Sequence, residues 1–446
     1  MTYTEALEYL ASFVNYENIP SWPYKQSLKL NRFKEFLNGL GNPQYHLRCI
    51  HIAGTKGKGS TCAFIAHILK EAGFKVGLYT SPHLADFRER IRILDKGVSY
   101  PKGTPGFEGM ISPRDLTALV AKIKPYIASF DHKSKYGGLS FFEVYTALAF
   151  LYFQKKGADF VVLETGLGGR LDATNTAHPL ICVITPISYE HTQKLGNTLK
   201  KIAAEKSGII KKGLRQLIVV SAPQTREADK VIRARCRKMR AKFYQAGNGI
   251  RYRCKNNHFN IKGFFEIYRG LKIKLIGKHQ VINAAVAAAA VELLRFYNIR
   301  ISSFQIKKGL YHTIWPGRCE IIMRNPCVVI DGAQNRASAL VLREALRNNF
   351  KYRRLILVLG ISKDKDIAGI SSELHDLADK VILTRADNLR ASAPRDLAGY
   401  FLDKELFITD NVREAKREAL LLAGKEDLIL VCGSLFVVGE FRNDKL

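Results

Sequence analysis

The amino-acid sequence predicts an α/β protein with two domains, of which the first contains a mostly parallel sheet. Apolar runs that suit buried strands alternate with helix-like runs, and this alternation is typical of a parallel sheet covered on both faces. A glycine-rich loop, HIAGTKGKGST at residues 51–61, lies between a predicted strand at 47–52 and a helix pattern at 63–72. A second strand–helix series follows, so we expect domains at 1–297 and 298–446.

Length and composition indicate a soluble, globular protein of the cytoplasm. A chain of 446 residues suits two or three domains, and 47% hydrophobic with 25% charged residues is an ordinary globular composition. No apolar run approaches the roughly 20 residues of a membrane span, because the nearest, 144–153 and 281–294, are short or contain Asn283 and Glu292. The N-terminus lacks the basic flank and apolar core of a secretory signal, and we expect no membrane partner.

The eight cysteines are scattered, mostly within apolar, strand-like runs, and none forms a C-x-x-C pair. This pattern is typical of reduced core thiols in a cytosolic protein. We therefore expect neither a zinc site nor a disulfide framework.

The formal net charge of +30 is the strongest compositional signal. It suits either nucleic-acid binding or a solvated surface that attracts small anions. Basic residues are densest around 226–274, where Arg233, Arg235, Arg237 and Lys238 share one helix-like segment. No recognised nucleic-acid module accompanies them, so we expect no nucleic-acid partner. We expect small-molecule substrates and a monomer.

The first domain alternates helices and strands along the chain. The predicted helices are 4–13, 28–40, 63–72, 116–127, 140–156 and 281–297. The predicted strands are 47–52, 76–80, 160–163 and 181–184. Ser112 and Ser140 are predicted helix caps, and 100–107 is a turn region rich in proline and glycine. The stretch 217–275 is strand-like and rich in turns, which suggests an antiparallel edge subsheet.

The second domain shows a shorter series of apolar strands separated by helix-length stretches. Its predicted strands are 328–330, 355–359, 381–383 and 428–431. This spacing suits a smaller, Rossmann-like α/β domain. The chain shows no convincing internal repeat and no low-complexity tract.

The loop at 54–61 has the features of a phosphate-binding P-loop. Its glycines allow backbone N–H groups to turn inward around an anion, and the following helix adds its N-terminal dipole. Lys58 suits the terminal phosphates, and the hydroxyls of Ser60 and Thr61 suit Mg²⁺. Gly59 separates the lysine from the hydroxyl, which departs from the common G-x-x-x-x-G-K-[ST] spacing. A glycine-rich loop that binds nothing is the alternative.

Further polar residues stand where predicted strands end. Ser81, Glu164 and His191 each follow such a strand. Ligands of open parallel sheets lie outside the carboxyl ends of the strands, and a carboxylate, a hydroxyl and an imidazole beside a phosphate loop suit Mg²⁺. The alternatives are a capping or paired carboxylate at Glu164 and a surface histidine at His191.

A second glycine-rich loop, GLGGRLDATN at 166–175, follows Glu164. Glycines allow a planar ligand to approach the backbone closely, and Arg170 or Asp172 can hold its polar edge. Phe142 suits an aromatic wall for that ligand. An ordinary core aromatic at the start of a helix is the alternative reading of Phe142.

Nine strings run in the order of one known family over nearly the whole chain. They are HIAGTKGKGST (51–61), YTSPHLADFRERIRI (79–93), LSFFE (139–143), VVLETGLGGRLDATN (161–175), HTQKLGNTLKKIAAEKSGIIKKG (191–213), GKHQVINA (277–284), WPGRCE (315–320), DGAQN (331–335) and CGSLF (432–436). On these strings the chain resembles folylpolyglutamate synthase and the bifunctional dihydrofolate synthase/folylpolyglutamate synthase, members of the Mur ligase superfamily. The glycine loop alone marks only the superfamily, whereas SPH, GLGGRLDATN and the 191–213 string together are highly specific.

The resemblance implies a Mur ligase-type ATP-binding domain, a C-terminal glutamate ligase domain and an ATP-dependent amide ligase activity. The γ-phosphate passes to the carboxylate of a pterin-linked acid, and the amine of L-glutamate attacks the resulting acyl phosphate. The implied acceptor is dihydropteroate, a tetrahydrofolate or both, and the implied cofactors are ATP and two Mg²⁺ ions. The alternatives are a basic P-loop ATPase that acts on nucleic acid and a related ligase with another carboxylate acceptor.

The resemblance also implies roles for single residues. The nucleotide-binding residues are Gly54, Thr55, Gly57, Lys58, Gly59, Ser60, Thr61, Asn283, Arg318 and Asp331. The magnesium ligands are Ser60, Ser81, Glu164 and His191. The substrate-binding residues are Arg90, Phe142 and Asp172 for the pterin and Ser434 for glutamate. The catalytic residues are Lys58, Lys206, His191 and Arg318, with Lys206 at the position that is carbamylated in the family.

Two positions depart from the family pattern. Lys56 stands where asparagine is usual and adds a positive charge beside the phosphates. Gln334 stands where histidine is usual, and its amide can replace a hydrogen bond to a phosphate oxygen but not a proton or a charge. We expect this second substitution to be tolerated.

Overall fold

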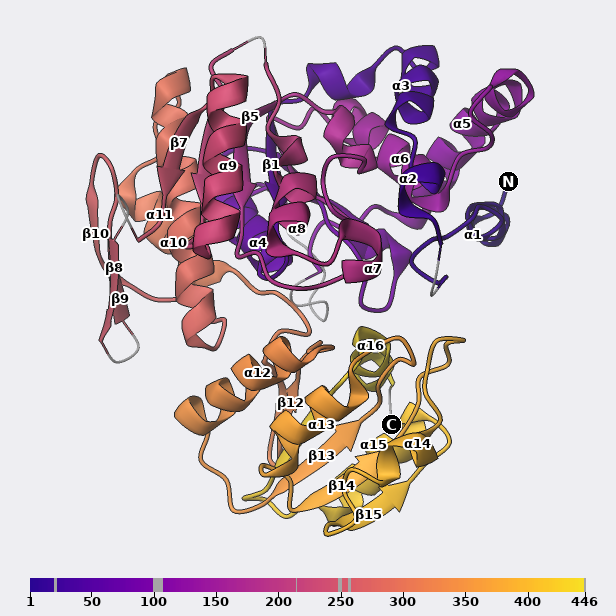
Figure 1. Ribbon diagram of the computed structural model, residues 1–446, viewed down its shortest axis with the longest axis vertical. Helices are drawn as coiled ribbons and strands as arrows, with labels where there is room; N and C mark the ends of the chain where they lie inside the picture. The colour runs from indigo at the N-terminus through magenta and orange to yellow at the C-terminus, as the bar shows by residue number, and fades with distance from the viewer. Residues whose placement is uncertain (20–21, 99–106, 214, 248–250, 256–257, 445–446) are drawn as a thin grey trace. The chain divides into compact units, whose positions relative to one another are not determined.

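The computed structural model describes residues 1–19, 22–98, 107–213, 215–247, 251–255 and 258–444. The chain forms two compact units, of which the second is drawn mainly in orange to yellow (Figure 1). The first comprises Met1–His83, Phe87–Lys274 and Gln280–Ile314, and the second Leu84–Asp86, Leu275–His279 and Trp315–Leu446. The predicted turn region at 100–107 lies, apart from Phe107, outside the described residues.

Helix α11 (Ser303–His312) belongs to the first unit, so the units divide later in the chain than the expected join at 297/298. The reason is that α11 packs on α4 (Lys58–Glu71). Gly309 allows a very close approach of the two helices, because a Cβ there would lie 2.4 Å from the Cα of Ile68.

A seven-stranded sheet forms the centre of the first unit, in the order β3-β2-β4-β1-β5-β6-β7. Its strands are β1 (Cys49–Ala53), β2 (Val76–Tyr79), β3 (Ile91–Leu94), β4 (Phe160–Glu164), β5 (Pro179–Ile184), β6 (Ile218–Ser221) and β7 (Lys242–Gln245). Every neighbouring pair is parallel except β2 and β3, which pair antiparallel at one edge. The predicted mostly parallel sheet is therefore confirmed, and β2, β4, β1 and β5 end side by side.

The antiparallel prediction for 217–275 is correct in part. Strands β8 (Arg251–Lys255), β9 (His258–Lys262) and β10 (Ile267–Leu271) form a separate antiparallel sheet. The prediction is wrong for β6 and β7, which join the main sheet in parallel. Helix α9 (Arg226–Met239) connects them, and parallel neighbours need a crossover of this length.

Two helices of the first unit begin at the predicted caps. Helix α5 (Pro113–Lys133) follows Ser112, and α6 (Phe141–Lys155) follows Ser140 in a capping box. The remaining helices are α1 (Tyr3–Ala11), α2 (Tyr24–Ser27), α3 (Leu30–Gly39), α7 (Thr192–Leu195), α8 (Leu199–Lys206) and α10 (Lys278–Glu292). The 3₁₀ turns are η1 (Pro43–His46), η2 (Phe87–Arg90), η3 (Ala173–Thr176), η4 (Ser207–Ile209) and η5 (Leu293–Tyr297).

The second unit contains a six-stranded sheet in the order β11-β12-β16-β13-β14-β15. The strands are β11 (Glu320–Arg324), β12 (Cys327–Ile330), β13 (Leu355–Leu359), β14 (Lys380–Leu383), β15 (Glu405–Ile408) and β16 (Leu428–Cys432). All neighbours are parallel except β11 and β12. The helices are α12 (Arg336–Asn349), α13 (Ile367–His375), α14 (Pro394–Ala398), α15 (Val412–Leu422) and α16 (Leu435–Asn443). The predicted smaller α/β domain is thus confirmed in fold class.

One helical stretch in the described part of the chain, Lys278–Tyr297, has the length and apolar composition of a membrane-crossing helix. Its 18-residue window has a mean hydropathy of 1.2, and 78% of the window is buried within the fold. Such burial is typical of the core helix of a folded domain.

Seven of the cysteine side chains that the structure describes are free thiols, and all of these but the half-buried Cys327 are buried. Burial raises the pKa of Cys62 and Cys182 well above the ordinary value, which keeps both thiols neutral. These residues are core thiols, as the sequence predicts.

Candidate active site

The phosphate loop, residues 54–61, connects β1 to α4 at the carboxyl edge of the first sheet. Gly57 has a φ of +81° directly before α4 begins at Lys58. A Cβ on Gly57 would lie 2.3 Å from Oδ1 of Asn283, on α10, so only glycine fits here. The structure thus places two of the predicted nucleotide-binding residues, Gly57 and Asn283, in contact.

The segment that follows β5 runs beside the phosphate loop. The N–H groups of Thr55 and Lys56 both donate to the carbonyl oxygen of Pro186, at 3.0 and 3.2 Å. The N–H of Ser188 donates to Oγ1 of Thr55 at 3.1 Å. These contacts fix the start of the loop against the residues that lead to His191.

Lys56 Nζ and Glu190 Oε1 form an ion pair at 2.8 Å. Burial would raise the pKa of Glu190, but nearby positive charges, first Lys56 and then His191, lower it to about 2. The extra charge of Lys56 is therefore matched by a carboxylate. Sequence analysis missed Glu190, because no local pattern links residues 134 positions apart.

Lys206 is the last residue of α8 and is only 3% exposed. Its Nζ donates a hydrogen bond to the carbonyl oxygen of Gly54 at 2.6 Å. Burial, and next the charge of Lys58, lower the pKa of Lys206 to about 7. A substantial share of the amine is therefore neutral at neutral pH, and only the neutral amine is a nucleophile.

Ser81 and Glu164 meet where the adjacent strands β2 and β4 end. The N–H of Ser81 donates to Oε2 of Glu164 at 3.2 Å, and Glu164 is buried. The hydroxyl oxygen of Ser81 is itself buried without a hydrogen-bond partner. Hydroxyl and carboxylate oxygens are the hard ligands that Mg²⁺ prefers, so this pair fits a magnesium ion.

His191 and Ser60 complete the predicted magnesium set. His191 directly precedes α7, with a φ of +52°, and is exposed, whereas Ser60 is buried in the first turn of α4. Among the described residues, no three His, Cys, Asp or Glu side chains cluster as in a typical transition-metal site. The predicted magnesium site is of another kind, because its ligands would be two hydroxyls, one carboxylate and one imidazole.

Asp172 stabilises the second glycine-rich loop, to which it belongs, by hydrogen bonds to other residues of the loop. Its buried carboxylate accepts hydrogen bonds from two N–H groups of the loop, at 2.9 and 3.1 Å, and from the hydroxyl of Thr174 at 2.5 Å. Burial raises the pKa of Asp172. The ring of Phe142 lies directly against the loop. Arg170 instead pairs with Glu205, at 2.8 Å.

Arg90, a predicted pterin-binding residue, is 1% exposed and engaged by side chains. Its Nη1 and Nη2 donate to the two carboxylate oxygens of Glu17, at 3.0 and 2.6 Å. Its Nε donates to Nδ1 of His83, at 2.9 Å. Sequence analysis singled out neither Glu17 nor His83 as a site residue, although His83 belongs to the SPH string.

Asp331 and Arg318 lie on neighbouring turns of the second unit. The carboxylate of Asp331 accepts hydrogen bonds from the N–H groups of Cys319 and Ala333, both at 2.8 Å. Burial raises the pKa of Asp331, and Arg318 opposes this rise. Arg318 Nη1 donates to the carbonyl oxygen of Gly317 at 3.0 Å. The structure therefore brings these two predicted nucleotide-binding residues close together.

Gln334 follows on the turn that leads into α12. The N–H groups of Gln334 and Asn335 both donate to Oγ of Ser338, at 3.2 Å each. Both donors belong to the backbone, so the turn does not depend on which side chain stands at position 334.

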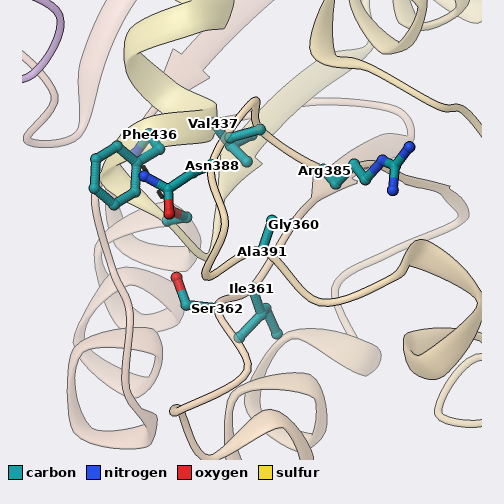
Figure 2. Close-up of a pocket in the computed structure, with 10 residues that line it drawn as sticks. Gly360, Ile361, Ser362, Arg385, Asn388, Ala391, Phe436 and Val437 are labelled. Carbon is teal, nitrogen blue, oxygen red and sulfur yellow. Dashed lines mark hydrogen bonds between the residues drawn. The ribbon is translucent and has the colours of Figure 1, made fainter. Parts of the chain in front are cut away.

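Ser434 precedes α16, and its hydroxyl accepts a hydrogen bond from the N–H of Phe436 at 3.2 Å. It lines a small pocket of about 10 Å³ in the second unit. Figure 2 shows Ser362, from the loop after β13, and Arg385 and Asn388, both from the loop after β14, around this pocket.

Two family models match the chain: "Mur ligase middle domain" over residues 119–291 and "Mur ligase, glutamate ligase domain" over residues 317–435. A phosphate loop on a parallel sheet, followed by a domain of the second kind, defines the class. The protein is an ATP-binding ligase of the Mur ligase superfamily.

Known proteins specify the family further. The chain is 35% identical to the dihydrofolate synthase/folylpolyglutamate synthase of Bacillus subtilis, over 96% of this chain and 99% of that protein. It is similar to the Mycobacterium tuberculosis folylpolyglutamate synthase complexed with ADP, with a TM-score of 0.85, 28% identity and coverage of 100% and 99%. It is also similar to Escherichia coli FolC in complex with DHPP and ADP, with a TM-score of 0.81, 28% identity and coverage of 99% and 96%. The chain belongs to the dihydrofolate synthase/folylpolyglutamate synthase family, and the resemblance found in the sequence is confirmed.

Proposed function

We propose that this enzyme joins L-glutamate through an amide bond to a pterin-linked carboxylic acid, in the cytoplasm and as a monomer. The acceptor is dihydropteroate, a tetrahydrofolate or both. The γ-phosphoryl group passes from ATP to a carboxylate oxygen of the acceptor, which releases ADP and forms an acyl phosphate. The glutamate amine then attacks the carbonyl carbon and loses a proton, and phosphate leaves.

The observation that carries the proposal is the gathering of positive charge and hard oxygen ligands at one sheet edge. A carboxylate is a poor electrophile until one of its oxygens becomes a leaving group, and phosphoryl transfer needs its negative charge to be neutralised. We assign Lys58 and the N–H groups of the phosphate loop to the phosphates of ATP. We assign Asn283, in contact with Gly57, to the adenine side of the nucleotide.

The same edge provides the groups for a metal. Ser60, Ser81, Glu164 and His191 would hold two Mg²⁺ ions, which neutralise phosphate charge when bound. The hydrogen bond from Ser81 to Glu164 orients the carboxylate before any ion arrives. The alternative of a P-loop ATPase that acts on nucleic acid is not favoured, because the relatives are folate-type ligases.

Lys206 is proposed to act as a carbamate. Its neutral amine would attack the carbon of CO₂, forming an N–C bond while one C=O π pair moves onto oxygen, and would then lose a proton, so that the side chain becomes an anion. Burial and the low pKa of the amine support this step. The resulting carboxylate would stand beside the phosphate loop, where it can orient cationic or metal groups.

The acceptor and glutamate sites follow from the family resemblance. We assign Arg90, Phe142 and Asp172 to the pterin-linked acid and Ser434 to glutamate. Arg318 and Asp331 are assigned to the nucleotide. This assignment is supported by the hydrogen bond between their two turns, which lies within the second unit. The backbone contacts at Gln334 support tolerance of this substitution.

An ADP-release assay with purified protein, ATP, Mg²⁺ and L-glutamate tests the proposal. Dihydropteroate and tetrahydrofolate are compared as acceptors, and RNA and single-stranded DNA are offered in place of an acceptor. We expect ADP release that requires both glutamate and a pterin-linked acid, together with a mass increase of one glutamyl residue in the product. ADP release stimulated by nucleic acid, or no release with either acceptor, would refute it.

A further inference from the structure

Three side chains form a hydrogen-bonded chain close to the strand end that carries Ser81. The Glu17 carboxylate holds both terminal nitrogens of Arg90, at 3.0 and 2.6 Å. Arg90 in turn donates from Nε to Nδ1 of His83 at 2.9 Å. Arg90 is buried, so its charge depends on this carboxylate for compensation. The proposed function uses Arg90 but leaves Glu17 and His83 without a role.

The chain fixes the tautomer of His83. A guanidinium group donates hydrogen bonds and never accepts them. Nδ1 of His83 must therefore be the acceptor and has no proton, so the single ring proton is on Nε2. A cationic imidazole is excluded by the same contact, because it would point a second N–H at Arg90.

Nε2 is left to bind another molecule. Among the described residues it has no hydrogen-bond partner, and the atom is not fully buried, so its N–H can reach a ligand. The His83 ring lies 4.5 Å from the ring of Phe87, and Arg90 lies 5.5 Å from the centre of the Phe141 ring. A donor among aromatic rings suits a planar ligand with an exposed lone pair.

We propose that Glu17 and Arg90 are positioning residues that hold His83 as an Nε2–H donor, and that this N–H binds a lone pair of the pterin-linked acid. The inference rests on the proposed function and adds to it a contact that selects the acceptor. Glu17 acts through Arg90 on the orientation of the ring, Arg90 contributes to the acceptor site through this contact, and His83 is the member of the chain that touches the ligand.

Steady-state kinetics with dihydropteroate and with tetrahydrofolate test the contact. His83→Leu removes the donor and should raise the KM of the acceptor about tenfold, the effect of one lost hydrogen bond, with the KM of ATP and of glutamate unchanged. His83→Gln keeps an amide N–H and should retain most of the affinity. Glu35→Gln, an exposed position on α3, is the matched control for a lost carboxylate.

A double-mutant cycle tests the chain itself. Glu17→Gln should raise the same KM, and adding it to His83→Leu should raise it no further, because both changes act on one contact. Additive losses, or an unchanged acceptor KM in His83→Leu, would overturn the proposal. Absence of ligation by the wild type would instead refute the proposed function.

Nitrogen NMR of the wild-type enzyme with ¹⁵N-labelled histidine gives a readout that does not depend on whether Glu17→Gln folds. The His83 signals are assigned by their loss in His83→Gln. We expect the shifts of a neutral ring with a bare Nδ1 and a protonated Nε2. A protonated Nδ1 would overturn the proposal.

Discussion

Lys206 Nζ lies 2.6 Å from the carbonyl oxygen of Gly54, so a buried amine at the end of α8 is hydrogen bonded to the phosphate loop. Burial and the nearby charge of Lys58 bring its pKa to about 7. A lysine of this kind is far more reactive toward CO₂ than one on the surface, because a larger share of it is neutral.

Replacement of this lysine tests the carbamate. Lys206→Ala should lower kcat by roughly 100-fold or more, since a charge beside the phosphates is lost. Formate or acetate should restore part of the rate by filling the space with an anion. ADP release with and without these acids is the measurement. Lys200→Ala, an exposed position on the same helix, should match the wild type. A Lys206→Ala enzyme with the wild-type rate would remove the carbamate from the mechanism.

Lys58 is expected to be indispensable for turnover. Lys58→Ala removes the cation at the start of α4 and should lower kcat by at least roughly 100-fold. The measurement is ADP release at saturating ATP, with thermal unfolding to verify the fold. The exposed Lys230→Ala is the control for a lost positive charge. Equal rates in the two variants would contradict the nucleotide assignment.

Two glycines that flank α4, Gly57 before it and Gly73 after it, separate the effect of backbone strain from that of close packing. Gly57 and Gly73 both have positive φ, but a Cβ at Gly73 would meet nothing within 4 Å, whereas one at Gly57 would meet Asn283. Alanine at either position should cost about 1–2 kcal/mol of unfolding free energy. Only Gly57→Ala should also weaken ATP binding, by roughly tenfold, because it displaces Asn283. Calorimetric titration of both variants with ATP measures this difference. Similar ATP affinities of Gly57→Ala and Gly73→Ala would contradict the assignment of Asn283.

Magnesium dependence tests the Ser81–Glu164 pair. Chelation with EDTA should abolish ADP release, and added Mg²⁺ should restore it. Glu164→Gln should raise the Mg²⁺ concentration for half-maximal activity by roughly tenfold or more, because the ion loses a charged ligand. Glu227→Gln, exposed on α9, is the control. Superimposable magnesium titrations for both variants would place the metal elsewhere.

Acid should weaken the ion pair between Lys56 and Glu190. The pKa of Glu190 is lowered from 4.5 to about 2 in the folded chain, so the pair stabilises the fold fully above about pH 4.5 and loses this contribution as the pH falls toward 2. The contribution is at most about 3 kcal/mol. Lys56→Met should flatten the dependence of unfolding free energy on pH between about pH 2 and pH 5. Urea unfolding across that pH range measures the unfolding free energy. An unchanged slope of this free energy against pH would show that the ion pair adds nothing to stability.

The phosphate loop could be recognised from sequence more easily than the start of its helix. The apolar pattern predicts a helix from residue 63, yet α4 begins at Lys58. The first turn contains Lys58, Gly59, Ser60 and Thr61, which show no apolar periodicity. The backbone conformation of Gly57 marks where the helix begins, and glycine is required there because Asn283, far along the chain, leaves no room for a Cβ.

Edge strands and distant side-chain pairs were the features that sequence patterns did not reveal. Strands β11 and β15 are only partly buried, so they lack the continuous apolar run that marks β12 or β13. The contact between Arg90 and Glu17 joins residues 73 positions apart. Ser81 and Glu164 were expected at the same sheet edge, but their direct contact depends on β2 and β4 being neighbours, which the strand order alone decides.

The adjacency of β2, β4 and β1 has a consequence for how the enzyme tolerates change. Neighbouring strands lie about 4.8 Å apart because of their ladder of backbone hydrogen bonds. The distances between the functional groups at the strand ends are therefore set by main-chain geometry, which is the same for every amino acid. Conservative replacements deep in these strands should make the protein easier to melt while leaving the chemistry of each surviving folded molecule untouched.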